Sequence, residues 1–384
     1  MKTEQIKKLE KEHVMQTYGR YDLVIDHGKG CYVFDKQGKK YLDFITGIAC
    51  VPIGHANKYV TKAICKQAKK LVQVSNMYYT EQQVVLAEKL AKLSGMQKCF
   101  FCNSGTEANE AAIKLAKKIT KKNKFIAFEH AFHGRTTGSL SATWKVKYKE
   151  PFKPLAPNVI FVKYNDINAL EKVITKEIAA VIIEPIQGEA GIIVPDKGYL
   201  KKVEQLCHKK KVLMIVDEVQ SGNGKTGEFF AYLHENIKPD IVTTAKGLAN
   251  GFPIGVCLAK KGIDFDKGNH ASTFGGNNLA CAAAIATIDF ILKKKLMKNA
   301  VKVGNYFMEE LNKLNKKSIV KVKGKGMMIG VELKQNNAND IVKKCLEKGL
   351  LLNSATENVL RFLPPLIATK KHVNEAVKIL DQVL

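Results

Sequence analysis

Short apolar runs alternate along this chain with longer segments in which apolar residues recur every three or four positions, from about residue 56 onward. The apolar runs include CFFCN, FIAFE, NVIFV, AAVIIEP and VLMIVDE. Segments such as EQQVVLAEKLAKL and GTEANEAAIKLAKKI show the helical spacing. Continuous apolar strands between helices are typical of a mainly parallel sheet covered on both faces. The pattern therefore predicts an α/β fold.

Both ends of the chain follow a different pattern. The first 45 residues predict a short polar helix and two strands around a Gln-Gly turn, in CYVFDKQGKKYLDF. After a long helical region at about 277–314, the strand-like runs SIVKVKG, GMMIGVEL, GLLLN and NVLRFLPP indicate a smaller α+β unit. We expect an N-terminal segment (1–45) that packs with the small domain, a large domain (46–285) and a C-terminal small domain (286–384).

The composition of the chain limits the class of protein. It has 384 residues and is 46% hydrophobic, and no apolar run approaches the roughly 20 residues of a membrane span. The N-terminus lacks the apolar stretch of a secretory signal. Nine cysteines without regular spacing fit free thiols in a reducing cytosol. We therefore expect a cytoplasmic protein. Cys99 and Cys102 lie in a strand, on opposite faces, so we expect no metal or redox site there.

A net charge of +26 raises the possibility of a nucleic-acid partner. The lysines are spread along the whole chain, and no arginine-rich patch, zinc finger or aromatic-basic module accompanies them. The excess is better explained by solvated helix faces, which could help to attract anionic ligands. We expect no nucleic acid and no membrane as partner.

In open α/β sheets, ligands bind beyond the carboxyl ends of the strands. The segment NSGTEANE (103–110) follows one strand and opens a helix, whose free N–H groups suit an anion such as phosphate. Another strand is followed by HAFHGRT (130–136), where Phe132 and His133 could offer a ring face. Each signal is weak alone, because many helices begin in this way and Phe132 could equally be an ordinary core residue.

Two charged residues at strand ends carry more weight. Asp217 ends the apolar run VLMIV, where a buried carboxylate is costly unless it meets a cation or caps a helix. A protonated pyridine nitrogen would be such a cation. Lys246 follows the apolar strand DIVTTA, and a half-buried lysine there would have a lowered pKa and could form a Schiff base.

The segment GNGKTG (222–227) matches two nucleotide-binding patterns without their context. No helix clearly starts there, as a dinucleotide fingerprint requires, and Val219 stands where a P-loop needs glycine. We interpret the segment as a flexible loop.

Arginine is rare in this chain. Of 62 basic residues only three are arginine, at positions 20, 135 and 361. Lysine cannot replace arginine where a carboxylate is bound by two parallel hydrogen bonds. Arg135 and Arg361 lie in segments that resemble a site, and two such groups would suit a dicarboxylate such as glutamate. Chance survival would explain the scarcity but not these positions, and Arg20 is assigned a structural role.

Six motifs occur in the order seen in class III pyridoxal-phosphate aminotransferases: SGTEANE, FHGRT, EPIQGEAG, DEVQSG, TTAKGLANGFPIG and STFGGN. The similarity covers essentially the whole chain. The N-terminal stretch TYGRYDLVIDHGKGCYVFDKQGKKYLDF resembles the acetylornithine aminotransferases most, with the ornithine aminotransferases close behind. The resemblance implies pyridoxal-phosphate fold type I, with a large domain built on a sheet of the seven-stranded type, a homodimer with active sites at the subunit interface, and pyridoxal 5′-phosphate as cofactor.

The resemblance also implies roles for particular residues. Lys246 would form the Schiff base and move the proton, and Asp217 would pair with the ring nitrogen. The remaining cofactor contacts would be made by Ser104, Gly105 and Thr106 at the phosphate, Phe132 and Val219 on the ring faces, Gln220 at O3′, and Thr273 from the neighbouring subunit. Substrate would be bound by Arg135, Ser272 and Arg361, and Glu189 would pair with Arg361 when the reacting end of the substrate carries no carboxylate.

Three positions depart from the family pattern. Asn223 and Lys225 stand where an apolar residue and arginine are usual, and Asn278 stands where proline is usual. The segment ACVPIGHANK is also irregular, in a region that lines the substrate entrance. None of these changes removes a catalytic group, although they leave the choice of substrate open.

We therefore expect an aminotransferase that moves the δ-amino group of N-acetylornithine to 2-oxoglutarate, in arginine synthesis. The alternatives within this class are transamination of ornithine, succinyldiaminopimelate or, less favoured, 4-aminobutyrate. An aminomutase or racemase of the same class would keep Lys246 and Asp217 but need no second keto acid. A basic nucleic-acid-binding scaffold is the alternative outside enzymes.

Overall fold

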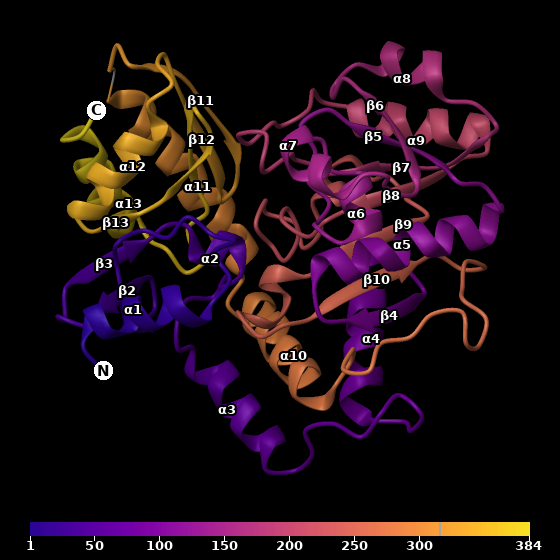
Figure 1. Ribbon diagram of the computed structural model, residues 1–384, viewed down its shortest axis with the longest axis horizontal. Coiled ribbons are helices and arrows are strands. Elements are labelled where there is room, and N and C mark those ends of the chain that lie inside the picture. Colours follow the sequence, from indigo (N-terminus) through magenta and orange to yellow (C-terminus); the bar gives the residue numbers. More distant parts are fainter. Residues whose placement is uncertain (315) are drawn as a thin grey trace.

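A sheet of seven strands forms the centre of the larger lobe, at the right of Figure 1, in the computed structural model, which describes residues 1–314 and 316–384. In sheet order the strands are β4 (Lys98–Cys102), β10 (Gly255–Ala259), β9 (Ile241–Thr244), β8 (Leu213–Asp217), β7 (Ile178–Ile183), β5 (Lys124–Phe128) and β6 (Asn158–Val162). All of them run in one direction except β10, which is antiparallel to both of its neighbours. The predicted mainly parallel sheet is confirmed.

Helices cover both faces of this sheet, and the two faces belong to different groups of packed side chains. On one face Ala111 of α5 (Gly105–Thr120) packs in the same cluster as Ile182 of β7. On the other face Val203 of α9 (Tyr199–Lys210) shares a cluster with Val181 of β7. Because alternate residues of one strand serve opposite clusters and both are buried, the strands are apolar throughout.

Two four-stranded sheets form the smaller lobe, at the left of Figure 1. The first contains β1 (Ile25–Lys29), β2 (Tyr32–Asp35), β3 (Lys40–Asp43) and β13 (Leu350–Leu351). The second contains β11 (Ile319–Lys325), β12 (Met328–Leu333), β15 (Val359–Phe362) and β14 (Asn353–Thr356). Since β13 pairs with β3, the N-terminal segment and the C-terminal region lie side by side.

The remaining helices surround these sheets. They are α1 (Thr3–His13), α2 (Thr46–Ala49), α3 (Lys58–Ala68), α4 (Glu81–Ser94), α6 (Thr137–Ser141), α7 (Val146–Lys149), α8 (Ile167–Val173), α10 (Asn278–Lys293), α11 (Leu296–Lys313), α12 (Ala338–Glu347) and α13 (Lys370–Asp381). Three short 3-10 turns are η1 (Glu150–Phe152), η2 (Ala231–Glu235) and η3 (Lys246–Ala249). The predicted domain boundary at 285/286 falls inside α10. The division into domains stays a prediction.

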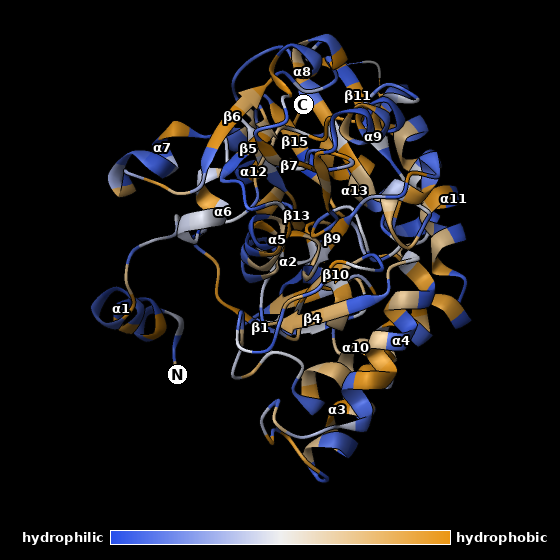
Figure 2. Ribbon diagram, turned by 90° about the vertical axis from the view of Figure 1, so that its right-hand side faces the viewer, coloured by the Kyte–Doolittle hydropathy of each residue, from blue (hydrophilic) through white to orange (hydrophobic). Residues whose placement is uncertain are grey.

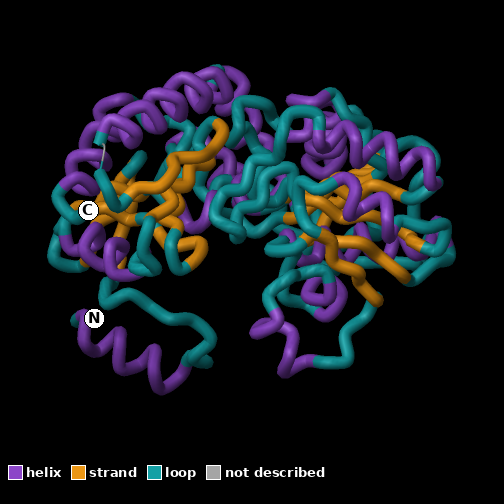
Figure 3. Tube along the Cα trace, turned by 90° about the horizontal axis from the view of Figure 1, so that it is seen from above, coloured by secondary structure: helices purple, strands orange, loops and turns teal. Residues whose placement is uncertain are grey.

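Hydropathy follows this arrangement. Helix α10 is apolar around most of its surface and buries ten of its residues, whereas α1 is largely hydrophilic and buries none (Figure 2). Within the described residues, no helix is both long and apolar enough to cross a membrane. Seen from above, the strands of the two lobes stand apart and loops occupy the region between them (Figure 3).

The segment 222–227 differs from its prediction. All but the last of these residues are buried, and Lys225 is 1% exposed. The backbone oxygen of Lys225 accepts a hydrogen bond of 2.8 Å from the N–H of Met327, which directly precedes β12. The predicted flexible loop is therefore wrong, because residues a hundred positions later in the chain cover it.

Candidate active site

The carboxyl ends of the parallel strands meet at one edge of the large sheet, where a cavity of about 220 Å³ opens. The lining residues are Gly105, Thr106, Asn109, Phe132, His133, Gly134, Arg135, Glu184, Asp217, Val219, Gln220 and Lys246. Most of the residues predicted to bind the cofactor are in this set. Ser104 lies just behind it as the N-cap of α5, and Thr273 does not line the cavity of its own chain.

Asp217 ends β8 and is held by three donors. Its Oδ2 accepts hydrogen bonds from Asn109 Nδ2 and from His133 Nδ1, each at 2.8 Å, and its Oδ1 accepts one from the N–H of Val219 at 3.0 Å. The side chain is almost wholly buried. A buried carboxylate fixed in this way at the wall of a cavity is positioned to meet a cation inside it.

Asn109 and His133 complete this network, a role that was not predicted for either residue. Asn109 Nδ2 also donates to the backbone oxygen of His133 at 2.6 Å, and its Oδ1 accepts from Thr243 Oγ1 at 2.7 Å. His133 Nε2 is buried without a partner among the described residues. His133 lines the cavity and uses the Nδ1 edge of its imidazole to bind Asp217, and the expectation that it offers a ring face stays a prediction. Both residues stood inside quoted motifs, but only the fold shows that they meet.

Lys246 opens the 3-10 turn η3, directly after β9. It is half-buried and has a φ of +43°, a left-handed conformation that costs free energy for a residue with a side chain. Its amine and the Asp217 carboxylate line the same cavity from neighbouring strands. The two groups that the predicted chemistry requires are therefore brought together.

The start of α5 forms another wall of the cavity. Ser104 caps the helix by accepting from the N–H of Glu107 at 3.3 Å, and Glu107 in turn accepts from the N–H of Asn103 at 2.8 Å. A Cβ on Gly105 would lie 2.7 Å from Val219 Cγ1, so only glycine fits there. The hydroxyl of Thr106 contacts the 135–139 segment, leaving backbone N–H groups at the helix start for an anion.

Glu184 follows β7 and is a further buried acid at this edge. Its two oxygens accept from the N–H groups of Phe132 at 3.0 Å and Gly188 at 3.3 Å. Burial raises the pKa of Glu184 to about 7, and the nearby Asp217 adds to this shift. Glu184 thus ties the loop that carries Phe132 to the turn that carries Glu189. Its position directly after an apolar strand is the same signal that revealed Asp217.

Arg361, in β15, is paired inside the protein. Its Nη1 donates to Glu189 Oε1 at 2.5 Å and to Gln220 Oε1 at 3.3 Å, and its Nε donates to Asn353 at 3.1 Å. Burial alone would raise the pKa of Glu189, but the charge and hydrogen bond of Arg361 outweigh it and lower that pKa. The predicted Arg361–Glu189 pair is present.

Arg135 is exposed and stacks on aromatic rings. Its guanidinium carbon lies 3.5 Å from the centre of the Tyr148 ring and 5.6 Å from that of Phe132. Tyr148 had not been predicted to contribute to the site. The stacking leaves the N–H edge of the guanidinium free to bind a carboxylate that lies in the guanidinium plane.

Ser272 and Thr273 lie on a surface loop. Asn76 donates to the backbone oxygen of Ser272 at 3.0 Å, and Asn103 donates to its Oγ at 3.2 Å. Thr273 is exposed and is followed by Phe274, which is 61% exposed. This chain brings Ser272 near the start of α5 but does not bring Thr273 to its own cavity.

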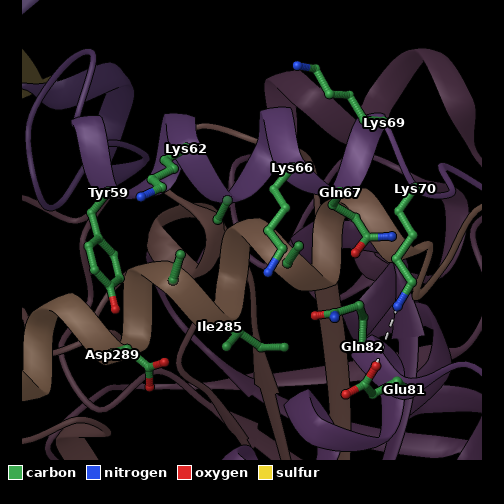
Figure 4. A pocket seen from close by; sticks show the side chains of 13 residues that line it. Tyr59, Lys62, Lys66, Gln67, Lys69, Lys70, Glu81, Gln82, Ile285 and Asp289 are labelled. Atoms are coloured by element: carbon green, nitrogen blue, oxygen red, sulfur yellow. Dashed lines mark ion pairs between the residues drawn. The ribbon is translucent and has the colours of Figure 1, made fainter.

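A wider cavity of about 770 Å³ lies between α3 and α10, and Figure 4 shows the lysines along its rim. Lys62 and Lys66 project from α3, and Lys70 approaches Glu81 at 3.7 Å. None of the predicted site residues lines it, and within the described residues no group of acids, cysteines or histidines could hold a metal ion.

The small cavity fits pyridoxal phosphate by its chemistry. Asp217 supplies an anion for the ring nitrogen, the start of α5 supplies donors for the phosphate, and Lys246 supplies an amine for the aldehyde. The close approach of Val219 to Gly105 leaves no room for a side chain at position 105. The doubly covered sheet and this cavity together define the class of pyridoxal-phosphate enzymes of fold type I.

The chain belongs to the class III aminotransferase family, whose sequence pattern matches residues 14–384. It is 48% identical over 373 residues to the acetylornithine aminotransferase of Archaeoglobus fulgidus, covering 97% of this chain and 98% of that protein. It is 47% identical to the enzyme of the same name from Aquifex aeolicus, covering 97% and 100%.

Solved structures agree with the fold. The ornithine aminotransferase of Toxoplasma gondii superimposes with a TM-score of 0.96 at 32% identity, covering 100% of this chain and 95% of that one. The acetylornithine aminotransferase of Elizabethkingia anophelis gives 0.89 at 37% identity, covering 99% and 98%. A second structure of the Toxoplasma enzyme records PLP at its active site. The chain is thus a transaminase with pyridoxal phosphate as cofactor.

Proposed function

We propose that the protein transfers the δ-amino group of N2-acetyl-L-ornithine to 2-oxoglutarate, giving N-acetylglutamate 5-semialdehyde and L-glutamate. The observation that carries this proposal is the Arg361–Glu189 pair, which is joined through Gln220 to the cavity that Lys246 and Asp217 line. A donor whose reacting end has no carboxylate leaves that pair intact, and glutamate displaces Glu189. The names of the relatives at 47–48% identity favour acetylornithine over free ornithine.

Pyridoxal phosphate supplies an aldehyde that condenses with amines and a ring that withdraws electrons from the bond to be broken. Asp217 would hold a proton on the ring nitrogen, and Asn109 and His133 keep that carboxylate in place. Lys246 would move a proton between the substrate and the cofactor. Its position after β9 places it in the lining of the cavity that would hold both.

The two arginines orient the substrates. For acetylornithine, Arg135 would bind the α-carboxylate, with Ser272 adjacent, and the δ-amine would point toward Lys246. For glutamate, Arg361 would bind the α-carboxylate and Arg135 the second one. Because Arg361 is 1% exposed, the incoming carboxylate replaces Glu189 in a site from which water is excluded, where two parallel hydrogen bonds are strong.

We also propose a homodimer in which Thr273 reaches the phosphate of the neighbouring subunit. Large apolar side chains surround the Thr273 loop, with Phe274 at 61%, Met77 at 82% and Tyr79 at 102% exposed. Asn76 joins the 71–79 segment to this loop through Ser272. An apolar surface of this kind favours a partner. We place the enzyme in the cytoplasm, since all nine cysteines are free thiols and a reducing compartment keeps them so.

Steady-state kinetics test the proposal. The values of kcat/KM for N-acetylornithine, ornithine, succinyldiaminopimelate and 4-aminobutyrate, each with 2-oxoglutarate, should be highest for N-acetylornithine. A clear preference for free ornithine would overturn the choice of substrate. Addition of glutamate alone should convert the bound cofactor to its amine form, and failure to do so would favour an aminomutase or racemase.

A further inference from the structure

The buried segment 222–227 contacts the backbone on which the catalytic lysine sits. It follows Asp217 in the chain by five residues, and its first N–H, that of Gly222, donates to the backbone oxygen of Glu218 at 3.0 Å. Asn223 is 3% exposed and has a φ of +60°. Its side chain points across to β9 and η3, since its Nδ2 donates to the backbone oxygen of Ala245 at 3.0 Å and lies 3.5 Å from Thr244 Oγ1.

The hydrogen bond from Asn223 reaches the peptide that joins Ala245 to Lys246. The oxygen of Ala245 and the nitrogen of Lys246 belong to the same planar peptide, so the orientation of that plane helps to set φ of Lys246. The oxygen accepts a second hydrogen bond at 3.0 Å from the N–H of Leu248, within the 3-10 turn. Lys246 has a φ of +43°, which an unsupported lysine rarely adopts. The surrounding structure must hold this strained conformation, and in this chain Asn223 supplies one donor from outside the turn.

The oxygen of the same Asn223 amide indicates that the N–H donor is the group this position requires. Asn223 Oδ1 is buried and has no hydrogen-bond partner among the described residues. An unpaired buried oxygen is unfavourable, and an apolar side chain, which is usual at this position in the proteins that this chain resembles, would avoid it. Turning the Asn223 amide over would place its oxygen against the backbone oxygen of Ala245. That acceptor therefore determines which way the amide is oriented.

We propose that Asn223 is a positioning residue for Lys246: its amide fixes the peptide that precedes the lysine and so holds the amine where it meets cofactor and substrate. This inference rests on the role proposed above for Lys246. It deepens the proposed function by assigning a task to a residue that makes no contact with substrate.

Two substitutions in the holoenzyme test the inference. Asn223→Gly removes the amide and tolerates the positive φ, and Asn223→Asp keeps the shape but sets an acceptor against the oxygen of Ala245. For both variants we expect kcat to fall about 10-fold, with KM for N-acetylornithine and 2-oxoglutarate within about two-fold of the wild type. The midpoint of the pH titration of the visible absorbance of the lysine-bound cofactor should also shift, because the amine changes its position relative to its surroundings.

Asn299→Ala is the matched control. Asn299 is half-buried and its Nδ2 donates to the backbone oxygens of Leu366 and Ala368, away from the cavity. This variant should lose stability but keep the wild-type titration midpoint and kcat.

An unchanged midpoint and kcat in Asn223→Gly, with a loss of stability similar to that of the control, would overturn the inference. So would failure of both Asn223 variants to fold while the control folds, because the amide would then serve the fold alone. A wild-type protein that gains no visible band with pyridoxal phosphate would instead contradict the role of Lys246 itself.

Discussion

The two arginines of the site occupy opposite environments. Arg361 is 1% exposed and makes hydrogen bonds to Glu189, Gln220 and Asn353, all within this chain. Arg135 is exposed and stacked on Tyr148, and no ion pair joins it to a carboxylate in the described part of the chain. We call the Arg361 side the closed half of the site and the Arg135 side the open half.

This difference indicates how one cavity binds two unlike substrates. Under the proposed roles, a carboxylate would bind in the closed half only by displacing Glu189, so this half would discriminate between substrates. In the open half the guanidinium is already free, so any substrate with a carboxylate at the right distance is bound. Interactions with an exposed arginine are weakened by water until a partner surface covers them. The proposal therefore assigns discrimination between substrates to the closed half and retention of both substrates to the open half.

Removal of Lys246 should have the largest effect, because both halves deliver their substrate to it. We expect Lys246→Ala to fold and form dimers with turnover reduced by more than about 1000-fold. Borohydride should no longer attach the cofactor to the chain, which mass spectrometry can check. Substantial residual activity would mean that the two halves serve a different amine.

Replacing each arginine by lysine should separate the halves. Arg361→Lys loses a planar donor in a buried pair, which should reduce stabilisation of the transition state for glutamate by about 2 to 4 kcal/mol. The half-reaction with glutamate should therefore slow by about 30-fold to 1000-fold. The half-reaction with N-acetylornithine should change much less. Arg135→Lys should weaken both half-reactions by similar, smaller factors. Single-turnover rates with each substrate measure this, and equal effects of the two substitutions would remove the distinction between the halves.

A charge placed on the exposed apolar surface around Thr273 should have the next largest effect, by weakening the contact that would complete the open half. Phe274 is 61% exposed beside Thr273, and Phe274→Asp should weaken the proposed dimer. We expect activity to fall about 10-fold at low protein concentration and to recover as concentration rises, by mass action. Sedimentation at the same concentrations supplies the oligomeric state. Phe152→Asp is a suitable control, since Phe152 is 63% exposed elsewhere. Activity independent of concentration would show that the open half is complete in one chain.

The sequence could predict the two charged groups that both halves share better than the contacts that hold them. Strands that are apolar on both faces are visible as continuous runs, and Asp217 and Lys246 stand out because a charge directly follows such a run. The contact between His133 and Asp217 could not be predicted, because they lie 84 residues apart and meet only when β5 and β8 share an edge. Segment 222–227 was misjudged for a related reason: glycine, asparagine and lysine are typical of exposed loops, and nothing local shows that Met327 covers them.

Substitution of Lys225, in the same segment, should have the smallest effect on activity, and its main effect should be on stability. Its Nζ donates to the backbone oxygen of Pro364 at 3.0 Å, three residues after Arg361, and burial lowers its pKa from 10.5 to about 7. The folded chain therefore binds this proton less tightly than the unfolded chain. The cost of burying the lysine is fully present below pH 7 and disappears as pH rises toward 10.5, so stability rises with pH in this window.

Lys225→Met should remove that dependence. At pH 7 the variant should be more stable than the wild type by about 3 kcal/mol, allowing for the lost hydrogen bond to Pro364, and the difference should shrink toward pH 10. Urea unfolding at several pH values measures it, and kcat at pH 8 should change by less than about two-fold, since Lys225 lies outside the cavity lining. Lys225→Arg stays charged throughout, so it should lack the rise in stability from pH 7 to 10. Parallel profiles for all three proteins would show that Lys225 keeps its proton, and that the closed half tolerates a buried charge next to the Arg361 segment.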